Sequence, residues 1–299
     1  MNDKIECGNE EDRMIKLLAC DLDGTLLDEK HQLPEINAKA ILKLQAAGIQ
    51  FMSATGRTYK SVDCLFKPYG IICEHLLLNG SILKDEQGTT LYDLPMQLDT
   101  VKEVMDIIDH EALCFNMYTN EGSVTPNIKK AKLQFLQHMQ ANGMSMEEAK
   151  EIMEKNAFHV YDREVRDLSA YLKENPRIYK METFSGNKEV SRMIRKELND
   201  VKGVALSDSI SENVEITDQN AQKGYTLRMY CEQHGIGLHE VVVMGDSMND
   251  LSMMKIFPNS IAVANANNEI KEAAAYITIS NEEHAVAYVI EEILKKHSL

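Results

Sequence analysis

Residues 17–20 form a short apolar run that ends in two aspartates, Asp21 and Asp23, followed directly by Gly24 and Thr25. A buried apolar run that stops abruptly at a polar turn is typical of a central parallel strand. In open α/β sheets, ligands bind at the carboxyl ends of such strands. Two carboxylates placed there repel each other unless they share a cation or a proton. The run therefore predicts an α/β fold with a reaction centre at the carboxyl edge of its sheet.

Two further segments carry groups that suit an anion. A second short apolar strand ends in Thr55, Gly56 and Arg57. A threonine hydroxyl and exposed backbone N–H groups at a strand-to-helix turn suit a phosphate oxygen. Lys223 opens an amphipathic run over residues 225–234, and a lysine at the start of a helix provides a positive charge for an anion. Both segments predict phosphate binding.

A fourth segment repeats the design of the first one. The β-branched run at residues 241–243 leads into Gly245, Asp246 and Asp250. Aspartates at positions i and i+4 lie on one side of the first helical turn. Each of the four segments has an ordinary interpretation when taken alone, such as a turn, a solvated lysine or an aspartate that caps a helix. Together, and each at the end of a strand or the start of a helix, they predict one site.

These motifs resemble those of the haloacid dehalogenase (HAD) superfamily, specifically the Cof-type phosphatases with a large inserted cap. The similarity extends over residues 14–294. The matching motifs are residues 21–26, Thr55-Gly56-Arg57, Asn79-Gly80, Lys223-Gly224 and residues 245–250. Residues 263–266 and 281–285 depart from the usual pattern of that branch, which leaves substrate preference open.

The resemblance implies roles for the first two acids. Asp21 corresponds to the nucleophile of the family, which attacks phosphorus and forms an aspartyl-phosphate. Such a covalent intermediate splits one slow hydrolysis into two easier steps. Asp23 corresponds to the residue that protonates the leaving oxygen and later takes a proton from the attacking water. A pKa raised by its acidic neighbours would suit Asp23 to that role.

The acidic residues also indicate a metal cofactor. Asp21, Asp23, Asp246 and Asp250 concentrate negative charge where another anion must bind, and oxygen ligands with room for water favour Mg²⁺. The family pattern implies that the Asp21 carboxylate, the Asp23 main-chain carbonyl and Asp246 bind this ion. Asp250 is implied to lie behind these ligands and to orient them.

The same family pattern implies which residues bind the phosphoryl group. Thr55, Gly56 and Lys223 are expected to hold its oxygens, and Asn249 is expected to add a hydrogen bond. Gly24 lets the backbone approach the phosphate without a Cβ atom in the way.

Arg57 and Asn79 each leave two interpretations open. Arg57 either steers the substrate or pairs with an acid. Asn79 belongs either to an ordinary Asn-Gly turn or to the rim of the site.

The length of the chain leaves room for a second domain. A single α/β core needs about 150 residues, and this chain has 299. The motifs assign residues 14–85 and 218–299 to a Rossmann-like, three-layer core with a parallel sheet, so residues 86–217 are expected to form an inserted α+β cap. The first thirteen residues are acidic and polar and are expected to be a disordered extension.

The pattern of the expected insertion alternates between helices and strands. Residues 101–108 have helical spacing, and residues 114–125 read as two strands around an Asn-Glu-Gly turn. A polar, helix-prone stretch covers residues 127–155. Further strands are expected at residues 158–161, 177–181, 203–206 and 214–217. A cap of this kind would exclude water and select the leaving group.

Charge and composition exclude several classes of partner. The net charge of −15 argues against nucleic acid and fits poorly with an anionic membrane surface. No window approaches the length of a transmembrane helix, and the six cysteines form no C-x-x-C pair, which indicates reduced thiols. We therefore expect a cytoplasmic protein whose partner is a small phosphate ester. The oligomeric state stays open.

The leading hypothesis is a Mg²⁺-dependent phosphomonoester hydrolase that acts on small phosphorylated metabolites, with sugar phosphates as the expected class. A phosphomutase of the phosphomannomutase type shares this core and style of cap, but it must hold a bisphosphate and needs basic residues on the cap. Lys129, Lys130, Arg163 and Arg166 are candidates that read more naturally as solvated charges. A non-catalytic phosphoryl-binding or signalling protein is a third possibility, in which the cap and Asp23 have no role.

Overall fold

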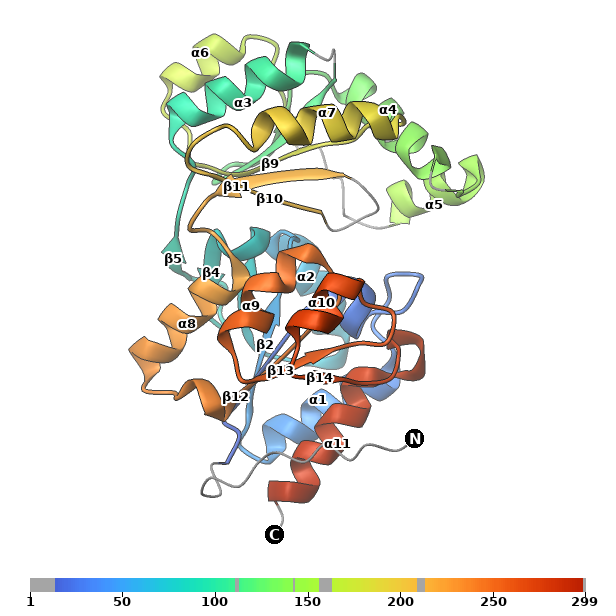
Figure 1. Ribbon diagram of the computed structural model, residues 1–299, viewed down its shortest axis with the longest axis vertical. Helices are drawn as coiled ribbons and strands as arrows, with labels where there is room; N and C mark the ends of the chain where they lie inside the picture. Colours follow the sequence, from blue (N-terminus) through green and yellow to red (C-terminus); the bar gives the residue numbers. More distant parts are fainter. Residues whose placement is uncertain (1–13, 111–112, 142, 156–162, 209–212, 298–299) are drawn as a thin grey trace.

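A computed structural model describes residues 14–110, 113–141, 143–155, 163–208 and 213–297. Within these residues the chain forms two α/β units, one above the other in Figure 1, each with its own sheet. The lower unit is the core and the upper unit is the cap. The cap is inserted between strands of the core, so the chain crosses between the units twice.

The core sheet has eight strands in the order β14-β13-β12-β1-β2-β3-β4-β5. The first six of these are parallel, and β4 and β5 continue the sheet as an antiparallel hairpin. The strands are β1 Leu17–Cys20, β2 Gln50–Ala54, β3 Glu74–Leu77, β4 Ile82–Lys84, β5 Thr90–Asp93, β12 Val241–Gly245, β13 Asn259–Ala262 and β14 Tyr276–Ile277.

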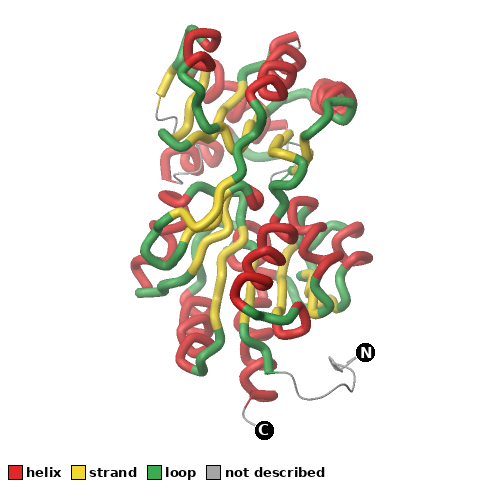
Figure 2. The backbone as a smooth tube through the Cα atoms, turned by 90° about the vertical axis from the view of Figure 1, so that its left-hand side faces the viewer, coloured by secondary structure: helices red, strands yellow, loops and turns green. Residues whose placement is uncertain are grey.

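Helices cover both faces of the core sheet, as Figure 2 shows from the side. Successive side chains of a strand point to opposite faces. Leu18 of β1 packs with α1 Glu35–Ala46, α2 Tyr59–Phe66 and α11 Ala285–His297, whereas Leu17 packs with α8 Lys223–His234 and α9 Leu251–Ile256. A short helix, α10 Asn268–Ala273, adds Ile270 to the first of these layers. The predicted three-layer α/β core is confirmed.

The cap has a six-stranded sheet in the order β10-β11-β9-β6-β7-β8. Its strands are β6 Phe115–Thr119, β7 Gly122–Thr125, β8 Arg163–Glu164, β9 Ile178–Thr183, β10 Val204–Ser207 and β11 Val214–Asp218. Its helices are α3 Leu98–His110, α4 Ile128–Ala141, α5 Met146–Lys155, α6 Leu168–Lys173 and α7 Lys188–Leu198. In Figure 1, α3, α6 and α7 lie on the side of this sheet away from the core. The other face of the sheet is therefore directed at the core.

Apolar and polar residues alternate along the cap strands. Met117 of β6, Met181 of β9 and Ile216 of β11 are buried with Val104 of α3 and Ile194 of α7. Because neighbouring side chains in a strand point to opposite faces, the residues between them are directed at the core. This alternation gives the cap one apolar face and one polar face.

One predicted boundary is wrong. The core was expected to end after residue 85, but β5 pairs with β4 and extends the core sheet to Asp93. The turn at residues 85–88 is polar and ends in a glycine, a pattern that is also typical of a linker between domains. In the structure this turn closes a hairpin, because the Asp85 side chain accepts the backbone N–H of Thr89. The strand expected at residues 158–161 and the extension over residues 1–13 lie outside the described residues. The helix at 101–108 and the other cap strands are present as expected.

Among the described residues, no helix combines the length and the apolar character needed to cross a membrane.

Candidate active site

The predicted motifs meet at the carboxyl edge of the core sheet because β1 lies between β2 and β12. Cys20 pairs with Ser53 on one side and with Met244 on the other. The residues that follow the three strands, Asp21, Thr55 and Asp246, therefore start from the same edge of the sheet.

A glycine allows the chain to turn at the end of β1. Gly24 has a φ of +80°, and a Cβ atom there would lie 2.6 Å from Oδ2 of Asp246. The backbone after β1 therefore passes directly against the Asp246 carboxylate, and a larger residue would push this carboxylate away.

Lys223 connects two of the acids. Its Nζ donates to Oδ1 of Asp21 and to Oδ1 of Asp250, each at 2.7 Å, and its side chain is fully buried. Burial alone would lower the pKa of Lys223, but the two carboxylates raise it well above its usual range. Gly224 lets this lysine come close, because a Cβ atom there would lie 2.3 Å from the backbone of Ser252 in α9. Lys223 is thus held as a buried cation beside Asp21.

Two other polar contacts orient Asp246. Thr25 Oγ1 donates to its Oδ1 at 3.0 Å, and Ser247 Oγ donates to its Oδ2 at 2.8 Å. Asp250 supports the turn from behind, since its Oδ2 accepts the backbone N–H groups of Asp246 at 2.9 Å and Ser247 at 3.1 Å. A Cβ atom at Gly245 would lie 2.4 Å from the Asp250 side chain, so this position also requires glycine.

Asp21, Asp246 and Asp250 each offer a carboxylate oxygen, and these oxygens lie within 4.8 Å of one another. Burial raises the pKa of Asp21, and burial together with Asp250 raises the pKa of Asp246 to about 7. Burial and the neighbouring carboxylates together disfavour the charged forms of Asp21 and Asp246 more than Lys223 favours them. Since all the donor atoms are oxygens, the residues present fit a hard divalent cation such as Mg²⁺.

The pKa of Asp23 differs from the prediction. Burial alone would raise its pKa, but Arg57 and His31 hold the pKa well below the usual range, so the predicted upward shift is wrong. Arg57 donates from Nε to Asp23 Oδ2 at 2.7 Å and from its terminal nitrogen to Oδ1, and Nδ1 of His31 lies 2.7 Å from the same oxygen. Of the two interpretations of Arg57, pairing with an acid is the one observed. His31 carries no motif in the sequence.

Thr55, Gly56 and Asn249 line the same pocket as Asp21 and Asp23, the two catalytic candidates. Thr55 Oγ1 accepts the backbone N–H of Arg57 at 3.2 Å, which fixes the turn after β2. A Cβ atom at Gly56 would lie 2.8 Å from Asn79 Oδ1, so the turn and Asn79 are in close contact. Three of the four predicted phosphate-binding residues thus line this pocket. The fourth, Lys223, lies fully buried beneath Asp21.

Asn79 belongs to more than a turn. Its backbone has a φ of +59°, and its buried side chain donates to Glu215 Oε2 at 2.7 Å and to Ser207 Oγ at 3.1 Å, both in the cap. It also accepts from Asn249 Nδ2 at 3.2 Å. Asn79 therefore joins the core to the cap at the edge of the pocket.

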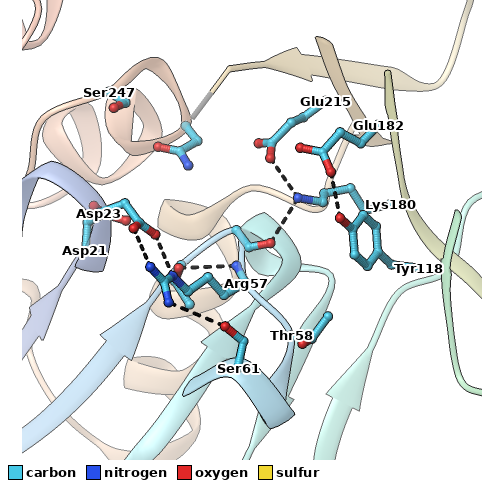
Figure 3. Close-up of a pocket in the computed structure, with 13 residues that line it drawn as sticks. Asp21, Asp23, Arg57, Thr58, Ser61, Tyr118, Lys180, Glu182, Glu215 and Ser247 are labelled. Carbon is cyan, nitrogen blue, oxygen red and sulfur yellow. Dashed lines mark hydrogen bonds and ion pairs between the residues drawn. The ribbon is translucent and has the colours of Figure 1, made fainter. Parts of the chain in front are cut away.

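The cap contributes four pocket residues that sequence reasoning missed, namely Tyr118, Lys180, Glu182 and Glu215 (Figure 3). Lys180 Nζ donates to Glu215 Oε1 at 2.7 Å and to the backbone oxygen of Gly56 at 3.0 Å. Tyr118 donates to Glu182 Oε2 at 2.6 Å. The sequence does contain a pattern that indicates such residues, because charged side chains alternate with apolar ones inside the cap strands.

A family profile described as haloacid dehalogenase-like hydrolase matches residues 18–290. The chain belongs to the haloacid dehalogenase-like hydrolases. It is a HAD-type phosphatase of the Cof branch, as its motifs indicated.

Curated relatives and solved structures of the HAD superfamily match the whole length of this fold. The chain is 28% identical to phosphatase YwpJ of Bacillus subtilis strain 168, covering 94% of this chain and 100% of the relative. It is 27% identical to the 5-amino-6-(5-phospho-D-ribitylamino)uracil phosphatase YwtE of the same organism, covering 94% and 98%. A solved haloacid dehalogenase-like hydrolase from B. subtilis superposes with a TM-score of 0.83 at 26% identity, covering 93% and 99%.

Two segments that depart from the usual HAD pattern support the loop of Asp23. Asn265 Nδ2 donates to the backbone oxygen of Gly24 at 2.7 Å, and Asn265 Oδ1 accepts the backbone N–H of Asn281 at 3.0 Å. Asn281 Nδ2 in turn donates to the backbone oxygen of Leu27 at 2.9 Å. Asn265 and Asn281, which lie in these segments, thus provide hydrogen bonds to the backbone on either side of Thr25.

The basic residues that a mutase would need do not reach the pocket. Arg163 and Arg166 are exposed and pair with Glu121 and Glu164. Lys129 is exposed and Lys130 is half-buried, both in α4. None of the four lines the pocket beside Asp21 and Asp23.

Proposed function

We propose that this HAD-type phosphatase hydrolyses phosphate monoesters of small metabolites, above all sugar phosphates, with Mg²⁺ as its cofactor and an aspartyl-phosphate on Asp21 as its intermediate. The observation that carries the proposal is the Asp21 carboxylate at the end of β1, held at 2.7 Å by a fully buried Lys223 and close to two further acids. A carboxylate in this position is fixed and paired, and it lines the pocket.

Mg²⁺ fits the site through the Asp21 and Asp246 carboxylates and, as in the family pattern, the Asp23 main-chain oxygen. When bound, it supplies positive charge that lets a phosphate anion approach the acids. Asp250 orients Asp246 through two backbone N–H groups rather than binding the ion itself. The raised pKa of Asp246 is the expected property of a carboxylate that lacks its cation.

In the first step, an oxygen of the Asp21 carboxylate attacks phosphorus, and the bond between phosphorus and the ester oxygen breaks. Thr55, the backbone of Gly56 and Asn249 hold the phosphoryl oxygens while charge moves onto the leaving oxygen, and Lys223 adds positive charge from beneath Asp21. Burial raises the pKa of Asp21, whereas the Lys223 cation lowers it and favours the charged form that attacks phosphorus. A bound Mg²⁺ would favour the same charged form.

Asp23 moves the protons in both steps. In the first it gives a proton to the leaving oxygen, and in the second it takes a proton from the water that attacks the aspartyl-phosphate. Its pairing with Arg57 and His31 favours the deprotonated form, which the second step needs. For the first step, a bound phosphate dianion repels the Asp23 carboxylate and competes for Arg57, and both effects raise the pKa of Asp23.

The polar cap face supports a sugar-like leaving group. Tyr118, Glu182 and Lys180 present hydrogen-bonding groups to the pocket rather than an apolar surface. The name of the relative YwtE includes a phosphorylated ribityl group, which is a polyol. Both observations support hydroxyl-rich phosphate esters as substrates.

The test is phosphate release from a panel of phosphomonoesters, with Mg²⁺ and with EDTA. Asp21→Asn is expected to lower kcat at least about 10³-fold, since it removes the nucleophile. Asp106→Asn, an exposed aspartate of α3, makes the same chemical change away from the pocket and is expected to match the wild type. Full activity of Asp21→Asn, or wild-type turnover in EDTA, would contradict the proposal. Isomerised product without free phosphate would favour a mutase instead.

A further inference from the structure

Charges on the pocket wall are unevenly divided between acids and bases. Among the described residues that line it, Asp21, Asp23, Glu182 and Glu215 are acids, whereas Arg57 and Lys180 are the cations. Half of these acids come from the cap, on the side that faces the leaving group. The cap side of the pocket therefore has more negative than positive charge.

The cap cation is already engaged by the protein itself. Lys180 is 3% exposed, and its Nζ contacts Glu215 Oε1 at 2.7 Å, the Gly56 oxygen at 3.0 Å and the face of the Tyr118 ring, 4.8 Å from its centre. An ammonium group has three protons to donate. Two of them have hydrogen-bond partners and the charge is offset by Glu215, so Lys180 attracts a further anion only weakly.

The core cation in the pocket is engaged in the same way. Arg57 directs its Nε and one terminal nitrogen at Asp23, and its other terminal nitrogen lies 3.4 Å from Ser61 Oγ. Two other positive charges belong to the site, namely Lys223 and the Mg²⁺ of the proposed function. Both act on the phosphoryl group that is transferred. A second anionic group on the substrate would thus meet no unpaired cation on the pocket wall.

Glu182 is a buried acid whose two carboxyl oxygens both accept hydrogen bonds. It is 3% exposed, its Oε2 accepts from Tyr118 at 2.6 Å, and its Oε1 accepts from Asn213 Nδ2 at 2.9 Å. A carboxylate offers about four lone-pair positions, and these two bonds occupy two of them. Burial raises the pKa of Glu182, whereas Lys180 and the hydrogen bonds from Tyr118 and Asn213 favour its charged form. In that form the carboxylate repels anions and accepts donors.

Asn249 indicates, independently of the charges, that a ligand of this pocket carries a hydrogen-bond donor. It is 8% exposed and lines the pocket, and among the described residues its Oδ1 is buried with no hydrogen-bond partner. A buried acceptor of this kind requires a donor, because an unsatisfied polar atom is costly. A hydroxyl or amino group of a bound substrate supplies that donor, whereas a carboxylate or a second phosphate has none to give.

We propose that the cap face, through Glu182 and Glu215, restricts the enzyme to phosphate monoesters whose leaving group carries no second anionic group and presents hydroxyl or amino donors. This inference rests on the proposed function. It names Glu182 as a residue that determines specificity and gives a physical reason why a bisphosphate, the ligand of a mutase, is disfavoured.

The experiment compares two substrates that differ in one group. Glucitol 6-phosphate and gluconate 6-phosphate have the same length, but one ends in a hydroxymethyl group and the other in a carboxylate. The ratio of their kcat/KM values is expected to favour glucitol 6-phosphate at least about tenfold, which is the scale of one unfavourable charge contact at a partly screened distance. A ratio near one, or a preference for gluconate 6-phosphate, overturns the inference.

Glu182→Gln tests the residue itself. Glutamine can accept from Asn213 and donate to the Tyr118 oxygen, so it removes the charge while keeping the hydrogen-bonded shape. We expect the ratio to fall about fivefold to tenfold. Glu197→Gln, an exposed glutamate of α7, changes the net charge equally and is expected to leave the ratio as in the wild type. An unchanged ratio in Glu182→Gln overturns the role of this residue.

The two proposals fail in different ways. No phosphate release from either substrate, or from any other monoester, would contradict the proposed function. Release from both at similar rates would leave the phosphatase intact and overturn the cap selection. If Glu182→Gln does not fold, the wild-type ratio for fructose 6-phosphate over fructose 1,6-bisphosphate still decides, and a ratio near one contradicts the inference.

Discussion

Two buried lysines, Lys223 in the core and Lys180 in the cap, have nearly the same surroundings. Each donates to a carboxylate at 2.7 Å, and the acids raise the pKa of each although burial alone would lower it. Their positions in the chain differ, since Lys223 opens a helix beside the ends of three parallel strands and Lys180 lies in the middle of β9. Two lysines with the same kind of ion pair therefore lie at different places in the fold.

The difference lies in what each pair faces. Lys223 contacts Asp21, the proposed nucleophile, so its charge acts where the reaction takes place. Lys180 contacts Glu215 and the Gly56 backbone, so it holds the cap against the phosphate-binding turn. We infer that the core lysine governs the chemical step and that the cap lysine governs binding. Three predictions test this division.

The largest effect is expected for Lys223→Met. This change leaves Asp21 and Asp250 buried without their cation, and breaking a buried ion pair costs about 3–5 kcal/mol of stability. It also lets Asp21 become protonated, so kcat is expected to fall at least about 10³-fold with little change in KM. Urea unfolding and steady-state phosphate release measure the two quantities.

Lys255→Met, which replaces an exposed lysine of α9, provides the matched control and is expected to retain stability and kcat. A Lys223→Met enzyme with unchanged kcat and a raised KM would contradict the proposed difference between the two lysines.

A smaller effect is expected for Lys180→Met. Glu215 keeps its hydrogen bonds from Asn79 and Ser207, so the expected loss of stability is about 1–3 kcal/mol. The hold of the cap on Gly56 is lost, so KM is expected to rise about tenfold while kcat changes less than about threefold. The same kinetic assay, with Lys188→Met at the exposed start of α7 as control, separates the two parameters. A fall in kcat without a rise in KM would assign the cap lysine to the chemistry and break the comparison.

The same contrast explains what could be predicted from the sequence. In the core, the predicted aspartates lie within a few positions of a strand end, so the apolar run marks the site before any contact is known. Asp21 and Asp246 were located in this way, and Lys223 was located at the start of a helix. In the cap, Lys180 and Glu182 lie inside a strand, and only the pairing of β9 with β6 and β11 directs them at the pocket. The alternation of charged and apolar residues indicates that Lys180 and Glu182 share one face of a strand, but it does not indicate which strands pair with that strand or what the face is directed at.

The core also contained one contact that local patterns missed. His31 and Arg57 reach Asp23 from two different loops, and their combined effect reverses the predicted direction of its pKa shift. The bidentate Arg57 and the hydrogen bond with His31 outweigh the burial that alone would raise the pKa of Asp23. The sign of a pKa shift depends on such distances, which spacing in the sequence does not provide.

The third prediction concerns the acids of the core, and its expected effect is about tenfold. The pKa of Asp246 is about 7 in the metal-free site, because burial and Asp250 disfavour its charged form. Below pH 7 this carboxyl carries a proton that Mg²⁺ must displace, whereas above pH 7 it is already ionised. The apparent affinity for Mg²⁺ is therefore expected to rise about tenfold from pH 6 to pH 8 and to level off at the upper end. Calorimetric titration of the substrate-free enzyme with Mg²⁺ at several pH values measures this change.

The control for this titration separates the core acids from those of the cap. Asp246→Asn removes the titrating group and is expected to bind Mg²⁺ more weakly, with much less dependence on pH. Glu182→Gln removes a buried acid of the cap and is expected to keep the wild-type pH dependence, because Glu182 is not among the three acids whose oxygens gather at the core site. Glu182→Gln could instead reduce the pH dependence of Mg²⁺ affinity as much as Asp246→Asn does. The acids of the core and of the cap would then titrate together. The division between a reacting core and a selecting cap would then fail.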